Sequence, residues 1–149
     1  MTQALAPDDA AQARAEIPAL LQTILLRRLN DGAAAGFGAS YVAAAKAYVT
    51  RHLDDRELQA EKVAQALGMS SRHLNRLFGA EAGVTVASYI RRQRLEAARR
   101  DLADARMDGL DVAAIACKWG FASQSHFTRL FRQAYGLPPG QARQFRRGR

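Results

Sequence analysis

The sequence predicts an all-α protein built from two helix-turn-helix subdomains joined by a long central helix, with a helical extension at the N-terminus. Three observations lead to this fold class. The alternation of β-branched and polar residues that marks strands is nearly absent. Glycine and proline are sparse, and between them apolar residues recur every three or four positions, as on one face of a helix. One heptapeptide occurs in two related forms, RHLNRLF at residues 72–78 and SHFTRLF at residues 125–131.

The predicted helices follow one another with short breaks. The first is expected over about residues 12–29 and ends at NDGAAAGFGAS, the expected linker. The next begins near Ser40, and its apolar face carries Val42, Ala45, Val49 and Leu53. Further helices are expected over residues 60–67, 71–82, 86–106, 112–119 and 124–135, and from residue 138 to about residue 145.

These elements divide the chain into two parts. Residues 1–38 are a helical extension or linker remnant, and residues 39–149 form the main domain. Within the domain we distinguish lobe one (about 39–83), a connecting helix (about 85–106) and lobe two (about 110–146).

The repeated heptapeptide lies in a larger repeated frame. In each copy an alanine precedes a glycine by four residues, as Ala64 precedes Gly68 and Ala116 precedes Gly120. An apolar residue follows each glycine by six or seven positions, which is the spacing of a helix-turn-helix. The alanine lets the two helices approach closely, and the glycine tolerates the positive φ of a tight turn.

Three polar residues stand where the N-caps of helices are expected. They are Ser70 and Ser123, before the second helix of each copy, and Asp111, before the helix that starts at residue 112.

Helical geometry assigns an outward face to the second helix of each copy. Its residues are Arg72, Asn75, Arg76 and Gly79 in the first copy and Ser125, Thr128, Arg129 and Arg132 in the second. Arginine, asparagine, serine and threonine hydrogen-bond base edges in the DNA major groove. A solvated polar face is the alternative, but two copies with donors and no carboxylate favour base contact.

Positive charge is concentrated in the C-terminal two-thirds. The net charge is +8; residues 1–50 carry four basic and four acidic side chains, whereas residues 51–149 carry 18 basic and 10 acidic ones. This asymmetry indicates a polyanionic partner, here double-stranded DNA, although a merely basic surface is the alternative.

The connecting helix has a length that suits DNA. About 21 residues would span roughly 32 Å, close to one turn of B-DNA at roughly 34–36 Å. Its arginines could neutralise phosphates or pair weakly with Glu96, Asp101 and Asp104; they are Arg91, Arg92, Arg94, Arg99 and Arg100.

Other site chemistries find little support. Cys117 is the only cysteine, so no internal disulfide is possible, and we expect it to be a buried structural thiol rather than a reactive one. His73 and His126 lack the partners of a metal site, so a phosphate or base contact, or simple exposure, is expected. Trp119 and Phe121 are expected in the core. We expect no enzyme, no cofactor and no metal.

The bulk sequence also bears on localisation. No segment approaches the roughly 20 apolar residues of a membrane span, and acidic residues, not basic ones, precede the first apolar run. A cytoplasmic protein is expected.

From Ser40 to Phe145 the chain resembles the DNA-binding domain of AraC/XylS-type bacterial transcription regulators. The stretches that carry the resemblance are VAQALGMSSRHLNRLF, YIRRQRLEAARRDL and, above all, IACKWGFASQSHFTRLFRQAYGLPP. The resemblance implies seven helices, asymmetric promoter sites, and transcription activation through contact with RNA polymerase.

Carried over by motif, the resemblance implies base-reading residues in both lobes. They are Arg72, Asn75 and Arg76 in lobe one, and Ser125, His126 and Arg129 in lobe two, with Gln124 and Thr128 close by. The chain departs from the family pattern at Gln59, where a Ser or Thr cap is usual, and at Ala142, where an aromatic residue is common. Many family members carry an effector-binding β-domain, which residues 1–38 cannot form, so no effector is expected to bind within this chain.

The sequence therefore predicts a sequence-specific DNA-binding transcription regulator, an activator, that inserts two recognition helices into successive major-groove segments. Two alternatives remain. A non-specific DNA-binding protein would need the charge but not the two ordered frames, and a helical protein-interaction module would not bind DNA in a salt-sensitive manner.

Overall fold

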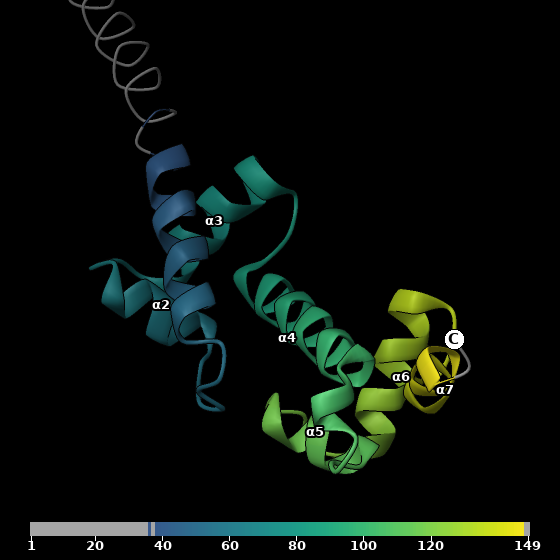
Figure 1. Cartoon of the computed structure of the whole chain (residues 1–149). Coiled ribbons are helices and arrows are strands. Elements are labelled where there is room, and N and C mark those ends of the chain that lie inside the picture. The colour runs from purple at the N-terminus through teal and green to yellow at the C-terminus, as the bar shows by residue number, and fades with distance from the viewer. Residues whose placement is uncertain (1–35, 37, 148–149) are drawn as a thin grey trace, which may run out of the picture. The chain divides into compact units, whose positions relative to one another are not determined.

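The computed structural model describes residue 36 and residues 38–147, so the helix expected over residues 12–29 lies outside the described residues (Figure 1). Contacts divide the chain into two units, Met1–Ser40 and Tyr41–Arg149, and both lobes lie in the second. Every regular element in the described ranges is helical. A helix over residues 38–51 is followed by α2 (Ala60–Ala66), α3 (Ser71–Ala82), α4 (Val86–Ala103), the 3-10 helix η1 (Ala105–Met107), α5 (Val112–Lys118), α6 (Gln124–Tyr135) and α7 (Pro139–Arg147).

The local signals expected from the sequence are confirmed. The Ser70 Oγ accepts the His73 N–H at 3.2 Å, and the Ser123 Oγ accepts the His126 N–H at 3.2 Å. The Asp111 carboxylate caps α5 in the same way, at 2.6 Å from the Ala114 nitrogen. Gln59 makes no side-chain cap at the start of α2, as its departure from Ser or Thr suggested.

The two turns have the same backbone geometry. Gly68 has φ 69° and Gly120 has φ 74°, in the left-handed region that favours glycine. In lobe one the Met69 N–H donates to the Ala64 carbonyl, and in lobe two the Phe121 N–H donates to the Ala116 carbonyl, both at 3.0 Å. The sequence repeat is therefore a repeat of turn structure as well.

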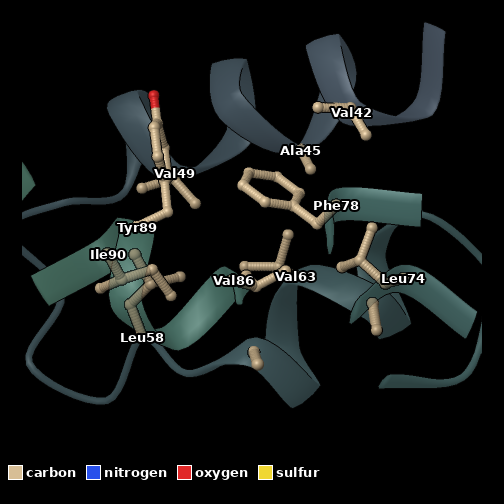
Figure 2. Close-up of a cluster of buried hydrophobic side chains, with 12 residues drawn as sticks. Val42, Ala45, Val49, Leu58, Val63, Leu74, Phe78, Val86, Tyr89 and Ile90 are labelled. Atoms are coloured by element: carbon tan, nitrogen blue, oxygen red, sulfur yellow. The ribbon is translucent and has the colours of Figure 1, made fainter. Parts of the chain in front are cut away.

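Lobe one has its own hydrophobic core. Figure 2 shows the Phe78 ring lying beneath the helix that carries Ala45 and Val49, with Val63 and Val86 on its other side. Phe78 and Leu74 are fully buried. Because the repeated heptapeptide supplies these two residues, its apolar positions anchor α3 to the lobe.

Lobe two is held by a row of aromatic rings. Ring centroids are 4.9 Å apart for Phe121 and Phe127, 5.4 Å for Phe127 and Phe131, and 4.6 Å for Phe131 and Tyr135. The Tyr135 hydroxyl donates to Glu96 of α4 at 3.0 Å, and burial together with this carboxylate raises the pKa of Tyr135 to about 12.

Trp119 and Phe121, which flank the second turn and were expected in the core, are buried to different extents. Phe121 is buried in the core of lobe two. Trp119 packs against that core but is half-buried, and its Nε1 donates to the Asp101 carboxylate at 2.8 Å. Ala142, which replaces a common aromatic residue, still packs against the same core.

Helix α4 is shorter than the sequence predicts. It has 18 residues, hence a length of about 27 Å at 1.5 Å per residue, because it ends at Asp104. The backbone of Asp104 is extended, and its carboxylate accepts the Arg106 N–H at 2.9 Å, which starts η1 instead. The helix by itself is therefore shorter than one turn of DNA.

The prediction of a buried Cys117 is wrong. Ile115 and Ala116 form the buried face of α5, and Cys117 lies about 100° further round the helix, where it is exposed. Within the part of the chain that the structure describes, no helix is long and apolar enough to cross a membrane.

Candidate nucleic-acid interface

The outward face of α6 is one continuous polar surface. One surface hollow is lined by six residues of this helix, namely Gln124, Ser125, Thr128, Arg129, Arg132 and Gln133. Five of these six are residues that the sequence predicts as DNA-contacting. Gln133 was missed, although it lies four positions after Arg129, the helical spacing that extends the same stripe.

His126 lies on the flank of this surface. Its side chain is exposed, but it lines a different cavity, together with Phe121 and Gly120. Thr128 is half-buried because it lies about 100° from the fully buried Phe127. The centre of the face is therefore formed by Ser125, Arg129 and Arg132.

The outward face of α3 is smaller. Arg72 and Arg76 are both exposed, and the Arg76 guanidinium donates to His73 Nδ1 at 3.3 Å. Gly79 continues this face, and an added Cβ there would meet no atom within 4 Å. Arg72 and Arg76 are therefore exposed on one face of α3, beside a position at Gly79 that no other atom approaches.

Asn75 does not lie on this outward face, contrary to the prediction. It is half-buried, and its Oδ1 accepts the backbone N–H of Val86 at 3.0 Å. The reason is geometric, because Asn75 lies three positions before the buried Phe78 and so only about 60° from it round the helix, on the side where α4 begins. The first N–H groups of a helix have no partner within it, and Asn75 satisfies one of them.

The start of α4 is thus capped twice. The Thr85 Oγ1 accepts the Ser88 N–H at 3.2 Å, and Asn75 accepts that of Val86. The second bond joins α3 to α4, so it links the second helix of the lobe-one turn to the central helix.

Replacing Asn75 with alanine is expected to lower the free energy of unfolding by about 1 kcal/mol, because the Val86 N–H loses its acceptor. Asn75→Asp keeps an acceptor oxygen and is expected to keep most of the stability. Urea unfolding of the two variants beside the parent chain measures this. Equal losses for alanine and aspartate would contradict the capping role.

The arginines on the two faces are not engaged in salt bridges. The four salt bridges of the described residues join Lys62 to Asp55, Arg99 to Glu96, Arg106 to Asp104 and Lys118 to Asp101. None involves Arg72, Arg76, Arg129 or Arg132, so their guanidinium groups can bind an external anion or acceptor. No group of three His, Cys, Asp or Glu that could hold a metal occurs among the residues that the structure describes.

The arginines of α4 differ among themselves. Arg99 pairs with Glu96 at 2.6 Å, as expected, and Arg92 lies over the Tyr89 ring. Asp101 and Asp104 were expected to pair within α4, but they take Lys118 and Arg106 instead. The Arg99–Glu96 pair is exposed and contributes little to stability, whereas the Lys118–Asp101 pair is part-buried.

Arg94 is the exception, because its guanidinium contacts backbone carbonyls and pairs with none of the acidic residues of α4. Its guanidinium is half-buried, and its Nη2 donates to the Asp55 carbonyl at 2.8 Å. Burial lowers the pKa of Arg94, and nearby Asp55 acts in the opposite direction. Arg94 therefore binds the backbone of the loop that precedes α2.

Comparisons with known proteins agree with this geometry. A family model described as a helix-turn-helix domain matches residues 63–144, which is more than half of the chain. A probable AraC family transcriptional regulator from Rhodopseudomonas palustris superposes with a TM-score of 0.66 at 27% identity, over 72% of this chain and 97% of that one. The chain belongs to the AraC family of transcription regulators.

Two further similar proteins are a transcriptional activator and a DNA-binding domain solved with its DNA. The transcriptional activator NphR from Rhodococcus sp. is 40% identical over 92 residues, which cover 62% of this chain and 26% of NphR. The DNA-binding domain of AdpA, solved in complex with a target DNA, has a TM-score of 0.63 at 27% identity and covers 72% of this chain and 93% of that one. The AraC-type chain described here thus spans about a quarter of the length of NphR.

Proposed function

We propose that residues 41–149 bind a promoter site in double-stranded DNA in a sequence-specific manner and thereby regulate transcription, with α3 and α6 entering successive major-groove segments. One observation carries the proposal. The same turn and helix are built twice, on separate cores, and each second helix exposes arginines that no salt bridge engages.

Each predicted contact residue then has a role. Arg72 and Arg76 in lobe one, and Arg129 and Arg132 in lobe two, donate to guanine edges or phosphates. Gln124, Ser125 and Thr128 add donors and acceptors beside them, and His126 contacts the DNA from the flank. Asn75 can reach DNA only through its amino group, because its oxygen is held by α4.

Further parts of the proposal rest on the family. Exposed cations of α4, namely Arg91, Arg92 and Arg100, neutralise phosphates, whereas Arg99 pairs with Glu96. The role is that of a cytoplasmic activator that contacts RNA polymerase, which the name of the relative NphR as a transcriptional activator supports. No catalytic role is assigned to any residue, and no effector is expected to bind this chain.

Selection of bound sites from a random DNA pool tests the proposal. We expect two base-sequence boxes about one helical turn, roughly 10 bp, apart. Binding to the selected site is expected to fall steeply with salt, because several phosphates are neutralised. Enrichment of no sequence, with salt-sensitive binding retained, would indicate a non-specific DNA-binding protein. The absence of DNA binding would indicate a protein-interaction module.

Arg129→Ala is expected to weaken binding to the selected site by about 1–3 kcal/mol and to leave affinity for unrelated DNA almost unchanged. The physical reason is that a base-edge contact contributes only on the right sequence. Fluorescence anisotropy with both DNAs measures the two affinities. Arg106→Ala is the matched control, since it removes the same charge from a residue that pairs with Asp104. Equal losses on both DNAs for Arg129→Ala would show that Arg129 contacts phosphate only.

A further inference from the structure

The cores of the two lobes share no residue. Helix α4 contributes Val86, Tyr89 and Ile90 to the core of lobe one. It contributes Leu95, Ala98 and Leu102 to the core of lobe two. Helix α4 is therefore the element that both lobes pack on, and the apolar contacts change from one lobe to the other between Ile90 and Leu95.

A cavity of about 610 Å³ lies at this changeover. Leu58, Gln59 and Asn75 of lobe one line it, and so do Gly120, Phe121 and His126 of lobe two. Apolar packing therefore does not fill this space, so a side chain that reaches from α4 to both lobes can add to the constraint that α4 itself supplies.

Arg94 lies at this point and contacts both lobes. On the side of lobe one, its Nη2 donates to the carbonyl of Asp55 at 2.8 Å and lies 3.4 Å from those of Arg56 and Leu58. On the side of lobe two, a Cβ added to Gly120 would lie only 3.2 Å from the Arg94 Cζ. The guanidinium thus fits between the loop that precedes α2 and the turn of lobe two.

The fit between the lobes leaves one polar atom of Arg94 without a hydrogen-bond partner. The Arg94 Nε is buried without a hydrogen-bond partner, and burying an unpaired polar group carries a desolvation penalty. The Arg94 guanidinium binds the carbonyls through one nitrogen while its flat face lies against Gly120, and a tetrahedral lysine ammonium has no such flat face. Gly120 in turn has two reasons to be glycine, its positive φ of 74° and the closeness of Arg94.

We infer that Arg94 is a positioning residue that fixes the angle between the two lobes, so that α3 and α6 reach their two DNA boxes together. The inference rests on the proposed function for its consequence on DNA, but not for the positioning itself. Simultaneous binding of two tethered modules depends on the effective concentration of the second at its site. A loose angle lowers that effective concentration and leaves each lobe's own contacts intact.

Binding to DNA with two boxes and with one box tests the consequence. Arg94→Ala is expected to weaken binding to the two-box site about tenfold, and binding to either single box by less than about twofold. Changing the distance between the two boxes by one base pair is expected to weaken DNA binding by the parent chain more than DNA binding by Arg94→Ala. The affinity of Arg94→Lys for the two-box site is expected to lie between those of the parent chain and Arg94→Ala. Arg106→Ala controls for the loss of a positive charge.

A distance measurement without DNA tests the positioning. Cys117 is exposed on α5 and is the only cysteine of the sequence, so it can carry one spin label; Ala80→Cys on the exposed side of α3 supplies the other. Pulsed electron resonance is expected to give a narrow distance distribution for the parent pair. A clearly broader distribution is expected when Arg94→Ala is added, with helix content unchanged by circular dichroism.

The outcomes separate the two proposals. An unchanged distance distribution in Arg94→Ala, or an unchanged spacing preference on two-box DNA, would overturn the positioning role. Equal losses on one-box and two-box DNA, together with a reduced folded fraction, would overturn it in favour of a purely structural role. A broadened distribution in a chain whose parent selects no DNA sequence would instead leave positioning intact and refute the proposed function.

Discussion

Replacing Phe127 with alanine is expected to lower the stability of lobe two by about 3–5 kcal/mol, the usual cost of emptying a buried aromatic site. Phe127 is fully buried and lies between Phe121 and Phe131 in the aromatic row. The free energy of unfolding of a small domain is only about 5–15 kcal/mol. The substitution is therefore expected to remove a large part of the stability of lobe two.

The loss is expected to be confined to lobe two, because its core shares no residue with that of lobe one. Amide hydrogen exchange, resolved by residue, measures this. Protection is expected to fall in α5 and α6 but to persist at Val63 and Leu74 in lobe one. Leu110→Ala serves as the control, since Leu110 is exposed. Equal loss of protection in both lobes would show that they unfold as one cooperative unit.

Ala97→Pro is expected to cost about 3 kcal/mol or more, because proline removes a backbone hydrogen bond of α4 and its ring clashes with the preceding turn. Ala97 is buried, in the part of α4 that packs against lobe two. A kink at this position would also change the angle between the two lobes. We expect a lower melting temperature and a loss of two-box DNA binding that exceeds the loss on a single box.

The matched control is Ala87→Pro. Ala87 is exposed in the first turn of the same helix, where N–H groups have no partner within the helix, so proline is tolerated better. The melting temperature and the two-box affinity of this variant are expected to stay close to those of the parent. If Ala97→Pro stayed folded with full affinity for the two-box site, α4 would not act as a rigid connection.

Much of the local structure could be predicted from the sequence because its signals act over a few residues. Ser70, Ser123 and Asp111 were expected as caps and are caps, since a cap depends on a side chain and an N–H three positions away. The two turn glycines were expected from their spacing. The exposure of Arg72 and Arg76 followed from the helical period.

Other features were not foreseen, because the partner of the side chain lies far along the chain. Asn75 has the residue type of a base reader, but its partner is Val86, eleven residues later. Arg94 has the residue type of a phosphate contact, but it donates to a carbonyl 39 residues earlier. No pattern within one helix distinguishes these two residues from their exposed neighbours.

The sequence by itself determined that this AraC-type chain has two turns of the same form, each followed by a capped helix with an arginine-bearing face. Those features follow from the local conformational preferences of glycine, the hydrogen bonds of caps and the period of a helix. Only the tertiary structure decided where α4 ends, that Cys117 is exposed, and that Asn75 and Arg94 bind backbone groups of other segments. These depend on which segments meet in space, and the free energy of such long-range contacts is not encoded in any short stretch of residues.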